Sequence, residues 1–444
     1  MGLGNRHSPE NPTAPLTRGH REWWPSRGIR CREWSFDDAE SPGGGFTQAH
    51  VSVPSGRAPS RPTMFLIALK MLLGDRSKYW MLVGGLAFSS LLMTQQYFVF
   101  QGLLSWTTSH MRNMRASIWV VESRVDQVNE TKAMRDTDVN RVRSVEGVDF
   151  AVPLFQGVLK ARTADGADKM IQMIGLHAGT LYGRPPRMIE GDITQIRLPN
   201  SVIIDTLAAE TNRLGAGLGR PLRIGDTFEI NDREARVVGI CQTERHFFGY
   251  PYVFSTYDQA LQYAPRQRKM LSMILAEPKP GSDVAEVARR IAAETGLRAY
   301  TVPQLEKSTL RWVWTNTGIP ISFLTTIILG FVVGVAISGQ TFYSFVLENL
   351  RNLGALKAMG AGNGLLAAML LLQSVTVGVI GFGIGIGLTA LFGLTVAKGG
   401  QPPFKMEVQF LFQALAAVLL ICALAALFGI RRVAKLEPAI VFRG

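Results

Sequence analysis

The run of residues most like a cofactor site is a series of alternating glycines at positions 381–387. A dinucleotide-binding fingerprint needs a strand before it, a helix that opens at it and an acidic residue about 20 positions later. This run lies instead inside a long apolar segment, where small residues four positions apart let two helix backbones approach closely. We therefore predict that Gly381 with Gly385, and Gly383 with Gly387, form helix contacts, and we expect no cofactor.

The remaining patterns give no indication of catalysis. The sequence has no G-x-x-x-x-G-K-[ST] phosphate loop, so we do not expect this chain to hydrolyse ATP. The six histidines lack metal-ligand spacing, and Cys31, Cys241 and Cys422 lie too far apart for a redox pair or a zinc site. Asp205 follows the apolar run 202–204, which is typical of a strand-end turn or cap. We expect no catalytic residue and no metal.

The composition places the chain in a membrane. Of 444 residues, 47% are hydrophobic and 18% are charged, against about 25% charged in an average soluble domain. Four segments without Asp, Glu, Lys or Arg, at 79–104, 319–343, 365–394 and 410–430, reach the length of about 20 residues that a spanning helix needs. The glutamines in these segments are expected to form hydrogen bonds between helices; they are Gln95, Gln96, Gln340 and Gln373.

The fold class that follows is a membrane protein with four transmembrane helices and a mixed α+β periplasmic domain inserted between the first and second. Lysines and arginines stand before the first segment, after the last, and between the second and third, which favours cytoplasmic termini and a large domain on the far side of the membrane. The predicted parts are an N-terminal extension (1–63), a lead-in with the first span (64–105), the external domain (106–318), the second span (319–343), a cytoplasmic helix (344–364), the third span (365–397), a short loop (398–409), the fourth span (410–430) and a tail (431–444).

The first 63 residues are rich in Arg, Pro, Gly and Ser and show no periodicity, so they cannot form a core. We expect natural translation to begin at Met64; a disordered cytoplasmic tail is the alternative. In the external domain, β-branched runs predict strands at 118–123, 150–162, 169–176 and 200–206, and a hairpin is predicted at 223–242 with its turn at Asn231, Asp232 and Arg233. Helices are predicted at 137–144, 283–295 and 304–318. Opposite charges nearly cancel there, which argues against binding of nucleic acid.

The segment 345–361 predicts a short amphipathic helix. Val346, Leu350, Leu353, Leu356 and Met359 recur at helical spacing, and Gly360 and Gly362 end the pattern. One interpretation is a docking helix for a cytoplasmic partner. The other is an interfacial helix whose apolar stripe rests among lipid headgroups.

These features together resemble a known family. The segments ENLRNLGALKAMGAGNGLL (348–366), QSVTVGVIGFGIGIGLTALFG (373–393), GDTFEINDREARVVGI (225–240) and RRVAKLEPAIVFRG (431–444) are similar to the permease subunits of MacB/FtsX-like ABC transporters. Among these, the lack of a fused ATPase and the segment IWVVES (118–123) most resemble DevC-type permeases.

The resemblance implies a homodimer, a separate ABC ATP-binding subunit, and in many members a periplasmic adaptor protein and an outer-membrane channel. It places the ATPase contact on Glu348, Arg351, Leu353, Gly354, Lys357 and Gly360. Asn349, Asn352 and Gln373 depart from the more charged pattern of the family. The function implied is export or mechanotransmission driven by ATP hydrolysis on the other subunit. The alternatives are an integral-membrane signalling protein with an external sensing domain and a lipoprotein-release or division-type role in the same superfamily.

Overall fold

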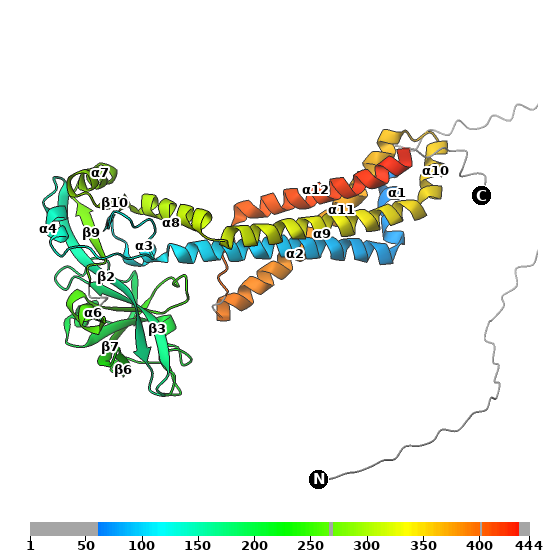
Figure 1. Ribbon diagram of the computed structural model, residues 1–444. Helices are drawn as coiled ribbons and strands as arrows, with labels where there is room; N and C mark the ends of the chain where they lie inside the picture. Colours follow the sequence, from blue (N-terminus) through cyan, green and yellow to red (C-terminus); the bar gives the residue numbers. More distant parts are fainter. Residues whose placement is uncertain (1–60, 266–269, 400–401, 435–444) are drawn as a thin grey trace, which may run out of the picture. The chain divides into compact units, whose positions relative to one another are not determined.

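The computed structural model describes residues 61–265, 270–399 and 402–434 (Figure 1). The predictions for residues 1–60 and for the tail beyond residue 434 lie outside the described residues.

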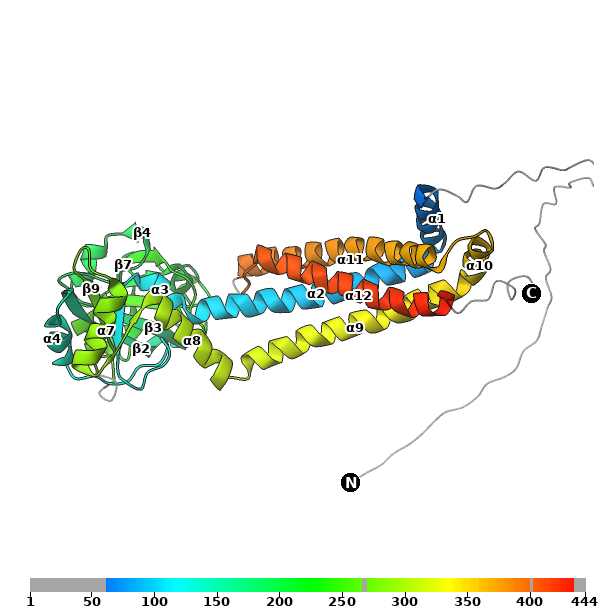
Figure 2. The ribbon, with the colours of Figure 1, turned by 90° about the horizontal axis from the view of Figure 1, so that it is seen from above.

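Long helices form one part of the described chain, and four of them run alongside one another in both ribbon views (Figures 1 and 2). The four are α2 (Arg76–Thr107), α9 (Ile319–Glu348), α11 (Asn363–Gly399) and α12 (Val408–Ala434). Two shorter helices, α1 (Arg61–Gly74) and α10 (Leu350–Ala358), contribute to the same apolar core. We call these six helices the helix bundle.

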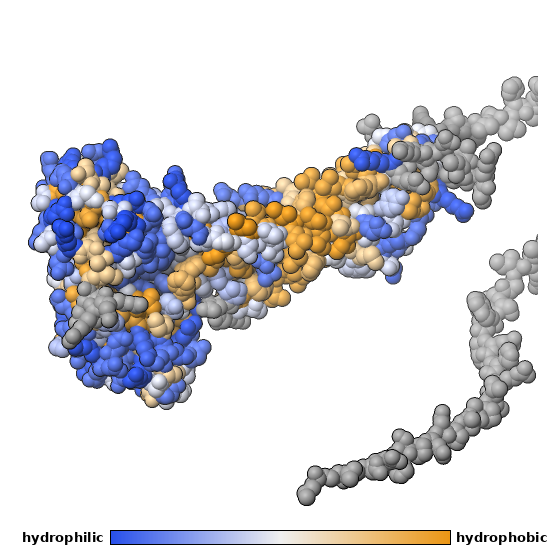
Figure 3. Space-filling view, viewed as in Figure 1, coloured by the Kyte–Doolittle hydropathy of each residue, from blue (hydrophilic) through white to orange (hydrophobic). Residues whose placement is uncertain are grey.

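Three of the four predicted spans are confirmed as helices that are long and apolar enough to cross a membrane. These stretches are Ile319–Glu348, Asn363–Ala397 and Val408–Arg431, and apolar residues cover much of the bundle surface in Figure 3. The predicted first span coincides with α2 but is not among the three that qualify, so a count of four is not confirmed. Serine, threonine and glutamine residues, Gln95 and Gln96 among them, lower the mean hydropathy of α2.

The chain between α2 and α9 folds into what we call the sheet domain. Its ten strands form one mixed sheet, ordered β10-β1-β9-β2-β3-β8-β5-β7-β4, with β6 paired to β2 and β7. The strands are β1 (Ile118–Val121), β2 (Val148–Arg162), β3 (Asp168–Leu176), β4 (Arg187–Gly191), β5 (Ser201–Asp205), β6 (Thr227–Ile230), β7 (Arg233–Gln242), β8 (Tyr252–Thr256), β9 (Met273–Pro278) and β10 (Arg298–Thr301).

Short helices connect or cover the strands. They are α3 (Ser109–Met114), α4 (Asp138–Arg143), η1 (Ile193–Arg197), α5 (Thr206–Ala209), α6 (Tyr257–Tyr263), α7 (Val284–Thr295) and α8 (Val302–Asn316). The predicted helices therefore correspond to α4, α7 and α8. Apolar side chains pack against both faces of the sheet. Its strands contribute to three separate apolar clusters, and alternate residues of β1 belong to two of them.

The strand β2 belongs to two halves of the sheet. Its first part, up to Leu154, pairs with β9, and its second part, from Phe155, pairs with β3. Most pairs are antiparallel, whereas β3 with β8 and β5 with β7 are parallel.

The predicted hairpin is confirmed as β6 and β7, but Arg233, which was predicted in the turn, is the first residue of β7. Asn231 and Asp232 form its two-residue turn with φ values of 47° and 60°, and these positive values are those of a type I′ turn. Asparagine and aspartate tolerate this left-handed conformation better than other side chains do. The turn therefore fixes the register in which Ile230 lies opposite Arg233.

Candidate functional site

The helix α10 is set off from its neighbours by a chain bend at each end. Asn349 separates it from α9 and donates a side-chain hydrogen bond to the carbonyl of Phe345 at 3.0 Å. At the other end Gly360 has a φ of +94°, its N–H donates to the carbonyl of Lys357 at 3.1 Å, and the N–H of Ala361 donates to that of Leu356 at 3.0 Å. This pair of bonds is a Schellman motif, whose left-handed position favours glycine. Gly360 therefore ends α10.

One face of α10 is buried in the bundle core. Leu353 and Leu356 are 2% and 6% exposed and belong to the same cluster as Ala68 and Leu72 of α1. Gly354 is buried as well. The apolar stripe is thus covered mainly by protein, which does not favour the interpretation of a stripe resting among headgroups.

The opposite face of α10 is exposed. It carries Arg351 and the side chain of Met359, which is 58% exposed, while Lys357 is half-buried. The apolar spacing predicts Met359 on the buried stripe, but Met359 lies after the last residue of α10 and its side chain is exposed. Asn352, Ala355 and Ala358 are also exposed here. They are not among the contacts predicted from the sequence. Their angular positions around the helix, relative to the buried Leu353, are the signal that could have indicated them.

Glu348 lies on a different element, because it is the last residue of α9. Its carboxylate pairs with the ammonium group of Lys78 at the start of α2, and Lys78 also lies 3.1 Å from Asp75. The Glu348 side chain nonetheless remains 61% exposed. The structure thus brings Arg351, Leu353, Gly354 and Lys357 together on α10 and leaves Glu348 beside them at a helix junction.

The four glycines of α11 differ in their surroundings. A Cβ atom added at Gly381 would lie 2.8 Å from the Cβ of Leu86, and one at Gly385 would lie 2.6 Å from the carbonyl oxygen of Ala87. Both contacts are with α2. At Gly383 and Gly387 no atom lies within 4 Å of such a Cβ. Close packing of α11 on α2 therefore involves Gly381 and Gly385.

Hydrogen bonds also join the helices of the bundle. The Gln373 side chain donates to the carbonyl of Ala68 at 2.6 Å, which joins α11 to α1, as expected for a glutamine in an apolar helix. Thr94 and Thr389 join α2 to α11 through their hydroxyl groups at 2.8 Å. Gln340 is instead exposed on α9.

The sheet domain contains a buried aspartate at the predicted cap position. Asp205 precedes α5 and accepts a hydrogen bond from the N–H of Ala208 at 2.6 Å, so the cap is confirmed. It also accepts from the N–H of Tyr252 at 3.0 Å and from the hydroxyl of Thr243 at 3.1 Å. Burial raises the pKa of Asp205 to about 6, although these three hydrogen bonds act in the opposite direction. The aspartate thus joins three segments that are distant in sequence.

Two histidines lie near this aspartate in the same apolar interior. The rings of His110 and His246 are 5.1 Å apart between centroids. His110 is within 3.2 Å of the Tyr252 hydroxyl, and His246 accepts a hydrogen bond from the N–H of Phe248 at 3.1 Å. Burial lowers the pKa of His246 to about 4, and burial together with the neighbouring His246 lowers the pKa of His110. Both rings are therefore neutral at pH 7.

We expect this arrangement to make folding sensitive to acid. A histidine whose pKa is lowered in the folded state stabilises the fold above its unfolded pKa, and this stability is lost as the pH falls toward the folded pKa. For His246 the window runs from about pH 6.5 to pH 4, and the loss at pH 5 is about 2 kcal/mol. His246→Gln, which retains an acceptor for the N–H of Phe248, should therefore lose less thermal stability than the wild type between pH 7 and pH 5.

The measurement is the unfolding temperature of the full chain in detergent at both pH values. Asp205, with its raised pKa, stabilises the fold as the pH falls from about 6 toward 4. Because Asp205 is present in both proteins, the difference between their changes in unfolding temperature reports the contribution of His246. Equal acid sensitivity of the two proteins would show that His246 is not held neutral by burial.

No three His, Cys, Asp or Glu side chains in the described part of the chain lie close enough together to hold a metal ion. The exposed surface at α10 carries a cation, Arg351, and a flexible apolar side chain, Met359.

Two family models and several known proteins match this chain. The model of the FtsX-like permease C-terminal family matches residues 321–438, and that of the MacB-like periplasmic core domain matches residues 81–294. A protein named an uncharacterized ABC transporter permease from Mycobacterium tuberculosis is 28% identical over 322 residues, which is 70% of this chain and 79% of that protein. Another of the same designation from Mycobacterium bovis is 26% identical over 321 residues, or 69% of this chain and 78% of that protein.

Solved structures similar to this chain include the periplasmic region of MacB from Actinobacillus actinomycetemcomitans, with 14% identity, a TM-score of 0.32 and coverage of 47% of this chain and 96% of that one. The extracellular domain of the transporter YknZ from Gram-positive bacteria is 13% identical with a TM-score of 0.31 and covers 42% of this chain and 99% of that domain. The two family models together span most of the sheet domain and the three apolar helices that follow it. The chain therefore belongs to the MacB/FtsX-like family of ABC transporter permeases.

Proposed function

We propose that this chain is the permease subunit of an ABC transporter in which a separate ATP-binding subunit docks on α10. The observation that carries the proposal is the two-sided character of this helix. Leu353 and Leu356 fix it to the bundle core, while Arg351 and Met359 face outward. A helix held in this way can pass a displacement of a docked partner to α9 and α11, between which it lies in the chain.

The ATP-binding subunit is proposed to dock at Glu348, Arg351, Lys357 and Gly360, whereas Leu353 and Gly354, also predicted as contacts, are buried and position the helix. Their roles differ. Arg351 and Lys357 supply positive charge, Leu353 and Gly354 set the depth of the helix in the bundle, and Gly360 ends it. Glu348 contributes exposed negative charge and ties the start of α2 to the end of α9.

The proposed cellular arrangement has both termini in the cytoplasm, α2 as a fourth span, and the sheet domain on the far side of a bacterial inner membrane. Basic residues at the flanks of the apolar segments support it. We further propose a homodimer. Gln340 is exposed on α9, and only 17% of the most apolar stretch of that helix is buried, whereas a glutamine in lipid is stabilised by a partner helix.

Within the family we propose a DevC-type system that works in export or in mechanotransmission across the envelope. A periplasmic adaptor and an outer-membrane channel would complete the system. The IWVVES segment at 118–123, whose first four residues form β1, supports this assignment.

Copurification tests the docking surface. We expect an ATP-binding subunit to purify with the tagged full chain from its native membranes. The double variant Arg351→Glu with Lys357→Glu should bind about tenfold less of this subunit, because reversed charges at an interface repel. Arg236→Glu, at an exposed position on β7, is the matched control and should retain the subunit. Membrane insertion is checked by fractionation. An inserted double variant that still binds the ATPase at the wild-type level would falsify the assignment of α10.

A further inference from the structure

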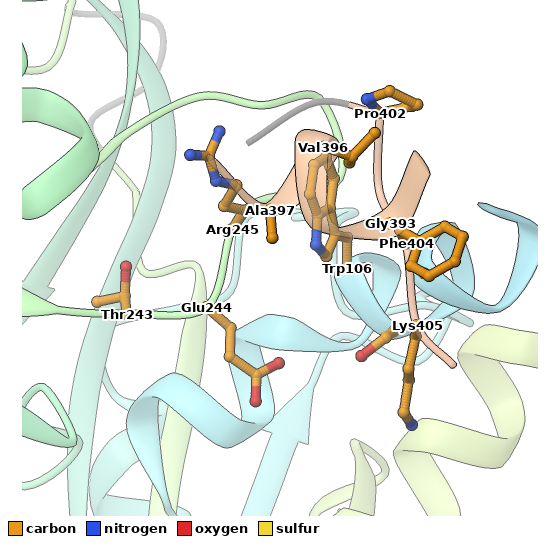
Figure 4. A pocket seen from close by; sticks show the side chains of 12 residues that line it. Trp106, Thr243, Glu244, Arg245, Gly393, Val396, Ala397, Pro402, Phe404 and Lys405 are labelled. Carbon is orange, nitrogen blue, oxygen red and sulfur yellow. The ribbon is translucent and has the colours of Figure 1, made fainter. Parts of the chain in front are cut away.

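A pocket of about 350 Å³ lies where the sheet domain meets one end of the helix bundle. Its walls come from the end of α2, the end of α11, the loop that precedes α12, and the segment 243–245 that follows β7. In Figure 4, Thr243, Glu244 and Arg245 lie on one side, Phe404 and Lys405 on the other, and Trp106 between them.

Hydrogen bonds hold the sheet-domain side of this pocket in place. The side chain of Asn113, which is 1% exposed, donates to the carbonyl of Glu244 at 2.9 Å and accepts from its N–H at 2.8 Å. Arg112 also lies 2.6 Å from the Glu244 carboxylate. Since both residues belong to α3, directly after α2, the segment 243–245 is fixed relative to the end of that helix.

The loop on the other side is equally constrained. The N–H of Lys405 donates to the carbonyl of Phe98 at 3.0 Å, and the Phe404 ring packs against that of Phe98 at 5.6 Å. A Cβ atom at Gly102 would lie 2.4 Å from the nitrogen of Phe404, so glycine is what allows the loop to approach α2 this closely. The pocket therefore has two fixed walls.

The charged groups in these walls favour an anion. Glu244 forms an ion pair with Arg112, which also lies 3.4 Å from Glu306. Arg245 is half-buried and forms no ion pair with any carboxylate in the described segments, and it acts on the buried Asp205 only through space. Lys405 is 55% exposed and lies 3.5 Å from Glu407. Among the residues that line the pocket, Arg245 and Lys405 are cationic and Glu244 is anionic, so the lining carries more positive than negative charge.

Another part of the pocket lining is apolar. Val396, Ala397 and Phe404 contribute to the pocket, and Ala397 is the last residue of the apolar stretch of α11 that is long enough to span a membrane. Trp106 lies half-buried at the end of α2, and tryptophan is enriched where spanning helices meet the headgroup region. The apolar lining is continuous with a helix surface suited to lipid.

We propose that this pocket binds an anionic amphiphile from the membrane leaflet nearest the sheet domain. Its headgroup lies between Arg245 and Lys405, and its apolar chain contacts Val396, Ala397 and Phe404 before it continues along the bundle. This inference goes beyond the proposed function and does not depend on an ATP-binding subunit.

Photolabelling of the full chain in nanodiscs tests it. The discs contain phosphatidylcholine with a small fraction of phosphatidylglycerol that bears a diazirine on its acyl chain, and labelled peptides are mapped by mass spectrometry. We expect label on the peptides with Val396 or Phe404, and a decrease of about fivefold for each removed charge in Arg245→Gln and Lys405→Gln, since one basic residue contributes about 1 kcal/mol to binding of an anionic lipid. Arg236→Gln is the matched control and should label as the wild type does.

A second arm separates two sources of the ligand. A soluble short-chain phosphatidylglycerol is added to the same discs as a competitor. If it fails to reduce labelling, the amphiphile enters from the bilayer; if it does reduce labelling, the pocket also admits amphiphiles from the aqueous side, and both results support the site. Labelling that is unchanged in Arg245→Gln and Lys405→Gln, or equal labelling by a diazirine phosphatidylcholine, would overturn the proposal.

Discussion

Replacing Gly385 with leucine is expected to prevent the helix bundle from packing. A Cβ atom at this position would lie 2.6 Å from the backbone oxygen of Ala87 and 2.7 Å from the Cβ of Ser90. The oxygen of Ala87 belongs to the backbone and cannot rotate away as a side chain could, so α11 and α2 would have to separate. Separation would also break the hydrogen bond between Thr94 and Thr389. Overpacking of this kind destabilises by about 1–3 kcal/mol in soluble cores and more where backbone must move.

Gly383→Leu is the matched control, because it lies on the same helix, two residues away, and no atom lies within 4 Å of its added Cβ. We expect Gly385→Leu to give little monodisperse protein after extraction in detergent, and Gly383→Leu to give a wild-type elution profile and unfolding temperature. Comparable losses in both variants would mean that the face of α11 with Gly383 is also packed, for instance against a second copy of the chain.

Asp205→Ala is expected to destabilise the sheet domain by about 3 kcal/mol. The substitution leaves three donors without their acceptor, the N–H groups of Ala208 and Tyr252 and the hydroxyl of Thr243. Each buried unsatisfied group costs about 1–3 kcal/mol. Relief of the buried charge, which the raised pKa of Asp205 reflects, offsets part of this cost. The unfolding temperature of the full chain in detergent at pH 7 is the measurement.

A second aspartate provides the control for the loss of a cap. Asp192 caps η1 by accepting from the N–H of Thr194 at 3.0 Å, but it is exposed and solvent can replace it. Asp192→Ala should therefore lower the unfolding temperature much less than Asp205→Ala. If the two variants are equally stable, the contacts of Asp205 with Tyr252 and Thr243 contribute nothing beyond the cap.

The parts of the fold that could be predicted are those with a local signal. Uninterrupted apolar length identified α9, α11 and α12, and turn chemistry at Asn231 and Asp232 identified the β6–β7 hairpin. The strands β8 and β9 were missed because their short apolar runs do not alternate, and such runs do not distinguish a buried strand from a helix segment. The parallel pairing of β5 with β7 depends on contacts that no single segment encodes.

In the candidate site, too, features with a local signal could be predicted and contacts between distant residues could not. The spacing of Leu353 and Leu356 predicted the buried face of α10, and Gly360 predicted its end. The spacing of four residues could not predict which glycine pair contacts α2, because Gly381 with Gly385 and Gly383 with Gly387 both have it. The position of α2 decides between the two pairs. Asp205 could be predicted as a cap from its neighbours, whereas its bond to Tyr252, 47 positions away, could not.

The strand β2 runs through both halves of the sheet, pairing with β9 along one part and with β3 along the other. A single extended backbone of 15 residues leaves no hinge at which the halves could pivot apart without rupturing a ladder. A pull applied through the chain ends that enter and leave the sheet domain would therefore move both halves of the sheet together.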